Sequence, residues 1–297
     1  MHDMSIGSQD HCRQVESFLR NLLPGAPTGY LRQLVKAGHL LVNGSPTGLE
    51  VVLRQDDRLS LKESSRTRAF LTAARPALDI IWEDERIVVI NKPSGLPMHR
   101  TAEYGDTDLV TLAIRHYAAM GIELHLRPVN RLDRGTSGAV ILAKSSTSAG
   151  MFGRFVKEEG LGKVYLALVR GGLPEEGMID FPLDGKEAQT RFRCLAQGEQ
   201  GALTAAFPVT GRTHQIRKHL SMLGHPILGD RRYGGTALAD YPGFALHAFQ
   251  VSFRHPAKGT ELTLFAPLPA DLALLASSVI GPALPAVLAG LPTSICR

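Results

Sequence analysis

Hydrophobic residues recur at helical spacing in the first part of the chain. Residues 15–22 place apolar side chains three or four positions apart, which predicts a helix that ends at Pro24 and Gly25. Residues 30–35 repeat this spacing and predict a second helix. The two stripes indicate a small packed unit at this end of the chain.

Short extended segments follow the two helices. Residues 40–42 predict a strand, and Asn43-Gly44 directly after it is a strong signal for a tight turn. The segment DDRLSL, residues 56–61, predicts a closing strand. We therefore expect a small α/β module over residues 1–62, followed by a polar linker over residues 63–76.

The hydrophobic pattern changes beyond the linker. Short apolar runs rich in Val, Ile, Leu and aromatic residues predict strands at DIIW, RIVVIN, AVILA, VYLALV and ELTLF, and DLVTLAIRHYAAM predicts a helix between them. The runs and their connections vary in length, without regular strand-helix alternation. Residues 77–297 are therefore expected to form an α+β domain on a mixed, largely antiparallel sheet.

An uncharged segment from Leu272 to Gly290 is long enough to suggest a membrane span. Pro282 and Pro285 interrupt it, and many of its residues are Ala, Ser or Gly, which add little transfer energy. This composition favours a short helix followed by a loose tail, without a membrane partner.

Charge and cysteine content indicate the kind of partner and the cellular location. The net charge is +5, and residues 1–75 hold 10 basic and 7 acidic residues, so most of the excess lies there and suits a polyanionic partner. The three cysteines, Cys12, Cys194 and Cys296, are too far apart for a zinc or disulfide framework. The start MHDMSIGSQD lacks a signal-peptide pattern, so a reduced, cytoplasmic location is expected.

The segment VNRLDRGTSG holds the first candidate for chemistry. Asp133 lies between Arg131 and Arg134, and cations beside an aspartate keep it ionised, as a nucleophile or an electrostatic anchor requires. The Gly-Thr-Ser-Gly run after it allows a sharp turn and close approach of a large substrate. The alternative is a structural ion pair at a strand end.

A second cluster, VTGRTHQIRKHLSMLGHPILGD, holds Arg212, His214, Arg217 and His219. It is either a basic surface helix or a helix with one arginine turned toward Asp133. The two histidines are five residues apart with no acidic residue between them, which does not fit a helical zinc pair.

A third piece, GKVYLALVRGG, places Tyr165 in a predicted strand. Its ring either packs in the core or faces a site. The glycine-containing segments GDRRYGG and GLGK match neither phosphate-loop pattern, so no ATP or dinucleotide cofactor is expected.

Four motifs in order, IVVINKPSGLPMH, NRLDRGTSGAVILAK, KVYLALV and GRTHQIRKHLSMLGHPILGD, resemble those of the RNA pseudouridine synthases that modify large-subunit ribosomal RNA and some transfer RNAs. The resemblance runs from about Ile80 to Pro267. It implies the pseudouridine synthase fold, isomerisation of uridine in RNA, no cofactor and no metal, and a monomer.

The resemblance also assigns residues. Asp133 matches the catalytic aspartate, Tyr165 the active-site tyrosine and Arg217 the arginine that pairs with the aspartate. Arg131 matches the residue that fills the gap left by the flipped uridine, and Asn130 replaces the family's usual histidine. The other RNA-binding candidates around this site are Arg134, Arg212 and His214.

The amino-terminal unit resembles the small RNA-binding module of ribosomal small-subunit protein four. Arg20, Arg32, Lys36 and His39 would line its basic face and meet phosphates; the alternative is a structural domain with solvated charges. Many members that act on ribosomal RNA carry such a module, which favours that target over transfer RNA.

The sequence leaves two other functions to consider. A non-catalytic RNA-binding factor in ribosome assembly is suggested by Asn130 alone. An aspartate-dependent small-molecule hydrolase predicts a metal site or a phosphate loop, and the sequence contains neither pattern.

Overall fold

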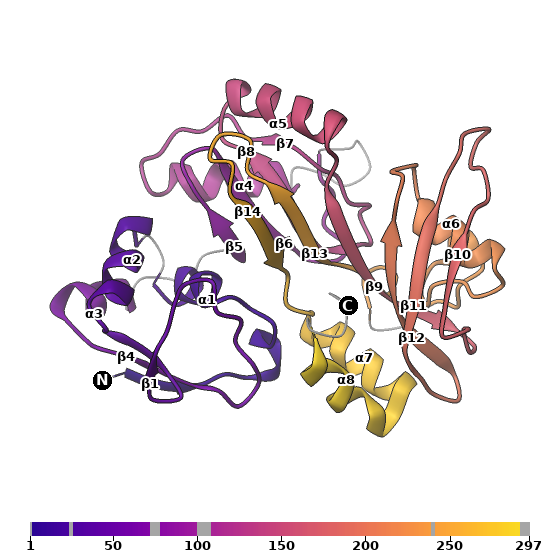
Figure 1. The fold of residues 1–297 in the computed structure, drawn as a ribbon, viewed down its shortest axis with the longest axis horizontal. Coiled ribbons are helices and arrows are strands. Elements are labelled where there is room, and N and C mark those ends of the chain that lie inside the picture. The colour runs from indigo at the N-terminus through magenta and orange to yellow at the C-terminus, as the bar shows by residue number, and fades with distance from the viewer. Residues whose placement is uncertain (1, 24–25, 72–77, 100–107, 239–240, 292–297) are drawn as a thin grey trace.

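The chain folds around two separate β-sheets (Figure 1). The computed structural model describes residues 2–23, 26–71, 78–99, 108–238 and 241–291. A four-stranded sheet belongs to residues 2–61, and a ten-stranded sheet begins at Ile80.

Residues 2–71 form the N-terminal unit. Its sheet has the order β1-β4-β2-β3 and is antiparallel throughout. Its strands are β1 (His2–Ser5), β2 (Leu40–Val42), β3 (Ser45–Pro46) and β4 (Arg58–Leu61). Its α-helices are α1 (Val15–Leu22), α2 (Thr28–Lys36) and α3 (Ser65–Leu71), and a single 3₁₀ turn covers Ser8–Asp10.

The tight turn predicted at Asn43-Gly44 joins β2 to β3. Both residues adopt left-handed backbone conformations, with φ of 51° and 80°, which a two-residue hairpin turn of this type requires. The Asn43 side chain accepts a hydrogen bond from the Arg58 backbone at 2.8 Å and donates one to Asp57 at 2.8 Å. The turn is therefore tied to the start of β4.

The expected linker over residues 63–76 is corrected in part, because residues 65–71 form α3. The Thr67 side chain is fully buried and lies 2.8 Å from the Tyr30 hydroxyl, so α3 packs on α2. Residues 72–76 lie outside the described residues.

The large sheet has the order β10-β11-β12-β9-β13-β8-β6-β5, with β14 on β13 and β7 on β8. Only the β13–β8 pair is parallel among its described strand pairs, so the predicted mixed, largely antiparallel α+β architecture is confirmed. Its strands are β5 (Ile80–Glu83), β6 (Ile87–Lys92), β7 (Arg127–Pro128), β8 (Ser137–Ala143), β9 (Gly162–Arg170), β10 (Glu176–Ile179), β11 (Thr190–Gln197), β12 (Gly201–Pro208), β13 (Leu246–Arg254) and β14 (Glu261–Phe265).

Helices cover the sheet in separate groups (Figure 1). Helices α4 and α5 lie by the half that holds β5, β6 and β8, while α6 lies by β10, β11 and β12. The helices are α4 (Leu109–Ala118), α5 (Ser146–Glu158), α6 (Gln215–Met222), α7 (Ala270–Ile280) and α8 (Leu284–Gly290), and 3₁₀ turns cover Arg231–Tyr233 and Gly281–Ala283.

The expected loose tail after a short carboxyl-terminal helix is also corrected, because residues 284–290 form α8. By length and composition alone, Ala270–Gly290 is long and apolar enough to cross a membrane. In the structure Gly281 and Pro282 divide this segment into two helices, and α7 buries Leu272 and Ala276 against the core that contains β12.

Strand register aligns two motifs that are distant in the sequence. Ala248 of β13 pairs with Gly138 of β8 on one side and with Tyr165 of β9 on the other. Because paired residues lie at the same level of a sheet, the loop that precedes β8 and the ring of Tyr165 face the same region. That loop contains Asp133.

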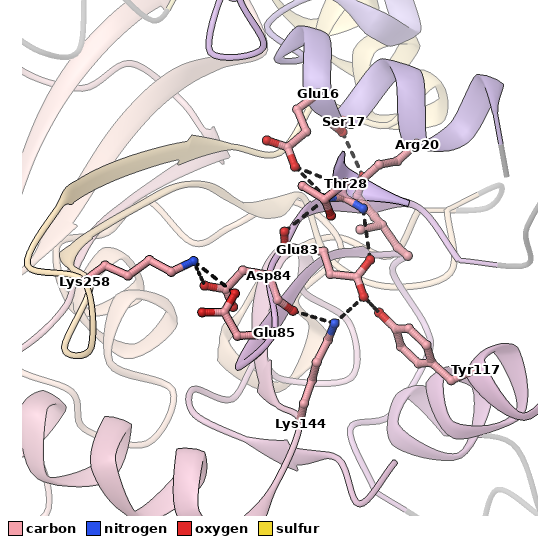
Figure 2. A network of polar contacts seen from close by, with 11 residues as sticks. Glu16, Ser17, Arg20, Thr28, Glu83, Asp84, Glu85, Tyr117, Lys144 and Lys258 are labelled. Atoms are coloured by element: carbon pink, nitrogen blue, oxygen red, sulfur yellow. Dashed lines mark hydrogen bonds and ion pairs between the residues drawn. The ribbon is translucent and has the colours of Figure 1, made fainter. Parts of the chain in front are cut away.

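Polar contacts join the N-terminal unit to the edge strand β5. Arg20 of α1 donates to the Glu83 carboxylate at 3.0 Å, and Ser17 donates to the Ile80 carbonyl at 3.0 Å (Figure 2). Arg13 donates to Asp79 at 2.9 Å. Arg13 is 6% exposed and Arg20 is 8% exposed, so these bonds form within a closed interface.

Candidate active site

Asp133 lies in the loop between β7 and β8, and its side chain is 30% exposed. The glycines after it allow close packing of this loop. A Cβ on Gly135 would lie 2.7 Å from the Phe244 ring, and a Cβ on Gly138 would lie 2.3 Å from the Ala248 carbonyl oxygen. Gly138 also has a φ of 111°, which side-chain-bearing residues rarely adopt. The Gly-Thr-Ser-Gly run therefore allows this loop to pack directly against Phe244 and Ala248.

Arg217 of α6 reaches Asp133 from a segment 84 residues away. Its Nη1 donates to Asp133 Oδ2 at 2.8 Å, so the cluster turns one arginine inward, toward the aspartate. The guanidinium lies 4.0 Å from the Phe244 ring centroid and 5.0 Å from that of Tyr233. Two aromatic rings and two acidic partners thus restrict its orientation.

Asp230 is a residue that the sequence did not single out. It is 2% exposed and accepts two hydrogen bonds from Arg217, from Nε at 2.7 Å and from Nη2 at 2.9 Å. Burial acts to lower the pKa of Arg217, but hydrogen bonds to Asp230 and Asp133 raise it overall. The only available signal was an aspartate at the end of the GHPILGD segment.

His214 lies on the other side of the same carboxylate. Its Nε2 is 3.6 Å from Asp133 Oδ1, and its Nδ1 is 2.8 Å from the Tyr233 hydroxyl. Burial lowers the pKa of His214, the negative charge of Asp133 acts to raise it, and Arg217 acts to lower it. His214 also has a left-handed backbone, with φ of 54°, a conformation that side-chain-bearing residues adopt at an energetic cost and often at functional sites.

Helix α6 is fixed in place by Gln215, which follows His214. Its side-chain oxygen accepts from Thr210 at 2.6 Å and from the Arg212 backbone at 2.9 Å, and its amide donates to the Gln189 carbonyl at 2.8 Å. These bonds anchor the start of the helix that carries Arg217.

Tyr165 is half-buried on β9 and packs against two hydrophobic clusters of the sheet. Burial raises the pKa of its hydroxyl, and the negative charge of Asp133 raises it further. The phenol is therefore protonated at neutral pH. The ring takes part in core packing, and its hydroxyl lies within electrostatic reach of Asp133.

Lys92 supports the backbone of the loop that carries Asp133. Its side chain is fully buried, and its Nζ donates to the carbonyls of Pro93 at 2.9 Å, Leu96 at 2.8 Å and Arg134 at 3.1 Å. Burial lowers the pKa of Lys92 to about 7, while the negative charge of Asp133 acts to raise it. Because the Arg134 carbonyl follows Asp133 directly, Lys92 fixes the backbone that carries the carboxylate.

Three of the predicted RNA contacts near Asp133 are exposed. Arg131, Arg134 and Arg212 reach the surface; Arg134 also donates to the Gly95 carbonyl at 3.0 Å, and Arg212 to the Glu187 carbonyl at 2.9 Å.

Asn130 bonds through its side chain to the backbone of β8. Its amide donates to the Ala139 carbonyl at 3.2 Å, and its side-chain oxygen accepts from the Ile141 backbone at 2.7 Å. These two bonds hold the loop that carries Asp133 to β8.

The predicted basic face of the N-terminal unit is also revised. Arg32 and Lys36 are exposed on α2, and His39 is half-buried with its Nε2 3.4 Å from Lys62 Nζ. Arg20 instead is buried between Glu16 and Glu83, at 2.6 and 3.0 Å. The structure therefore does not support phosphate binding by Arg20, because its guanidinium N–H groups form hydrogen bonds within the interface with β5.

Among the described residues, no group of three or more His, Cys, Asp or Glu side chains is placed to hold a metal ion. His219 lies in the core, where its Nδ1 is 2.9 Å from Thr190 and its Nε2 is 3.0 Å from the Phe181 carbonyl. Its ring nitrogens are both satisfied by these partners.

Comparison with known proteins decides the family. A sequence model described as RNA pseudouridylate synthase matches residues 86–222, a stretch that includes Asp133, Tyr165 and Arg217. The chain is 30% identical over 291 residues to the uncharacterized RNA pseudouridine synthase YlyB of Bacillus subtilis, covering 92% of this chain and 96% of that protein. The chain belongs to the RNA pseudouridylate synthase family. It is therefore an isomerase that acts on RNA.

Two further relatives extend the comparison. The synthase is 32% identical to ribosomal large subunit pseudouridine synthase C of Vibrio cholerae, over 88% of this chain and 91% of that protein. The structure of human RNA pseudouridylate synthase domain containing 4 aligns with a TM-score of 0.56 at 26% identity, covering 66% of this chain and 91% of the human one. The predicted pseudouridine synthase fold is thereby confirmed.

Proposed function

We propose that this synthase isomerises a uridine of large-subunit ribosomal RNA, with Asp133 acting on the ribose of a flipped-out nucleotide. The Vibrio cholerae relative is named for the large ribosomal subunit, which supports this target. The exposed cations of the N-terminal unit suit a long, structured polyanion.

The reaction breaks the bond between ribose carbon 1′ and uracil nitrogen 1. The base then rotates within the site, and uracil carbon 5 bonds to carbon 1′. The proton on carbon 5 leaves and a proton ends on nitrogen 1, so no atom is gained or lost. A stacked, paired uracil cannot turn in this way, so the target must leave the helix at a cost of a few kcal/mol. Arg131, which is exposed on the loop that carries Asp133, would fill the gap and offset part of that cost.

Asp133 has two roles compatible with its position. As a nucleophile it attacks carbon 1′ and displaces uracil; as a base it removes the carbon 2′ proton and yields a glycal. Both roles need an ionised, oriented carboxylate. Arg217 orients the carboxylate through its 2.8 Å bond, and Asp230 in turn holds Arg217.

His214 is a positioning residue in this scheme. With the Tyr233 hydroxyl donating to Nδ1, the proton of the neutral ring lies on Nε2 and points toward Asp133 Oδ1. Arg217 holds one carboxylate oxygen and His214 faces the other. The lowered pKa of His214 keeps the ring neutral near pH 7.

Tyr165 would stack on the uracil as it rotates. Its raised pKa means that the hydroxyl starts as a proton donor. It can accept the carbon 5 proton only by passing on its own, so a neighbouring acceptor or water is needed. This assignment makes Tyr165 a relay.

The observation that carries the proposal is the Asp133–Arg217 pair on an exposed loop beside Tyr165. Mapping of pseudouridine in total RNA, with and without the gene, tests the target. We expect one or more large-subunit ribosomal sites to disappear and to return with wild-type protein but not with Asp133→Asn. Loss confined to transfer RNA would reassign the substrate, and return with Asp133→Asn would contradict the role of the aspartate.

A further inference from the structure

A cleft of about 390 Å³ lies at the junction between the N-terminal unit and the large sheet. We call it the junction cleft. One wall comes from α1, α2 and the loop around residues 49–50, and the facing wall contains Trp82 of β5. This volume lies within the range of pockets that hold small ligands, so one nucleotide would fit.

Two basic and two acidic side chains line the junction cleft. Arg32 and Lys36 are exposed one helical turn apart on α2, and no carboxylate partner for either is found within the described parts of the chain. Of the two acids that line the cleft, Glu16 is buried and bonded to Arg20 at 2.6 Å. Glu50 is the exposed one. Two available cations therefore face one available carboxylate.

Trp82 supplies an aromatic surface in the same cleft. It is half-buried, and Lys258 Nζ lies 5.9 Å from its ring centroid, while Val35 and Leu49 add apolar area across the cleft. An aromatic ring beside cations is the combination by which proteins bind single-stranded nucleic acid, with bases on the ring and phosphates on the cations.

The wall that carries Trp82 is held rigidly. Its neighbour Glu83 accepts from Arg20 at 3.0 Å and from the Tyr117 hydroxyl at 2.7 Å, and it also pairs with Lys144 (Figure 2). These bonds fix Trp82 relative to α1 and thus to the cations of α2. A preorganised site loses less free energy on binding.

We propose that the junction cleft binds one unpaired nucleotide of the RNA substrate, with its base against Trp82 and its phosphate between Arg32 and Lys36. The inference rests on the proposed function for the identity of the polyanion. The cleft shares no residue with the Asp133 site. It therefore acts as a second contact on the same RNA and raises affinity through effective concentration.

Trp82 is the single tryptophan of the chain, so its fluorescence reports on this cleft directly. The full-length protein is titrated with a single-stranded oligoadenylate, which contains no uridine and so separates binding from isomerisation. We expect saturable quenching. Anisotropy of a labelled oligoadenylate should show at least about fivefold weaker binding for Trp82→Leu, with a smaller loss for Trp82→Phe, because stacking depends on the ring.

The cations are tested by Arg32→Gln combined with Lys36→Gln. This variant should bind oligoadenylate more weakly and with a smaller dependence on salt, because fewer phosphate contacts release fewer counterions. Lys157→Gln, which removes an exposed lysine of α5 outside the cleft, is the matched control and should bind like wild type.

Several results would overturn the inference: absence of quenching, Trp82→Leu binding equal to wild type in a protein with an unchanged melting temperature, or equal competition by a polyglutamate peptide. The outcome is independent of catalysis. Asp133→Asn should retain full quenching, and Trp82→Leu should raise KM for the RNA substrate while leaving kcat unchanged.

Discussion

Arg217 bridges two carboxylates, with Nη1 bonded to Asp133 at 2.8 Å and Nε and Nη2 bonded to Asp230 at 2.7 and 2.9 Å. The exposed acid is thus oriented by a buried one through a single planar group. An arginine suits this task because its fork of donors can bind a carboxylate with two bonds and still reach another.

Loss of the buried acid should disable the bridge. Asp230→Asn leaves Arg217, which is 6% exposed, with one anionic partner, and removing one member of a buried pair costs about 3 kcal/mol. We expect that loss in urea unfolding, together with a lower kcat. Asp184→Asn is the control, because Asp184 is 72% exposed and solvent screens its pair with Lys218, so its loss should cost little stability. Equal stability of the two variants would contradict the bridge.

The contact of His214 with Asp133 should affect the chemical step more than RNA binding. His214→Ala removes the group that lies 3.6 Å from Asp133 Oδ1 and orients it, so we expect a fall in kcat of about tenfold, which corresponds to about 1.4 kcal/mol in the barrier, with little change in KM. His214→Gln, whose amide can donate, should recover part of the rate. Single-turnover kinetics measure this, and an unchanged kcat in His214→Ala would exclude the positioning role.

Gly138 should not tolerate a side chain. Gly138→Ala would place a Cβ 2.3 Å from the Ala248 carbonyl oxygen at a φ of 111°, and we expect a loss of about 2 kcal/mol or more in the free energy of unfolding. Gly153→Ala is the matched control, since this helical glycine of α5 has open space around it and alanine favours helices. Comparable loss in both variants would refute the packing argument.

His247 should make stability depend on pH. It is fully buried between Ser137 at 2.9 Å and the Ala266 carbonyl at 3.0 Å, and burial lowers its pKa from 6.5 to about 4. Between these values the unfolded chain binds a proton that the folded chain does not. The free energy of unfolding therefore falls as pH drops from about 6.5 to about 4, by up to about 3 kcal/mol from this group.

Urea unfolding at pH 7.5, 5.5 and 4.5 measures that loss. His247→Gln should be less stable at pH 7.5 and should lose less on acidification than wild type, because the titrating group is gone. Equal losses in the two proteins would show that other groups dominate.

Local patterns predicted elements whose signals are contained in a few neighbouring residues. Residues 15–22 formed α1, and Asn43-Gly44 formed the β2–β3 turn. Strand β1 was not predicted, because its sequence, HDMS, is mostly polar and gains its order from pairing with β4. Residues 65–71 were predicted as part of a linker but form α3, because the buried contact of Thr67 with Tyr30 cannot be read from the polar composition around it.

In the site, too, local sequence signals do not reveal contacts between distant residues. Asp133, Tyr165 and Arg217 were assigned through family motifs, because physical reasoning left open whether an arginine of the cluster would face the aspartate. Burial could not be predicted for Arg20, whose partner Glu83 lies 63 residues away. Asp230 likewise has no local feature that distinguishes a buried acid from a solvated one.

The central claim is that the Asp133 carboxylate performs the chemistry. RNA labelled with tritium at uracil carbon 5 measures it most directly, because that hydrogen is lost to water when carbon 5 bonds to the ribose. Asp133→Asn keeps the size of the side chain and removes its charge. We predict that tritium release falls about a thousandfold or more while RNA affinity stays within about twofold of wild type. Release within tenfold of wild type would contradict the account.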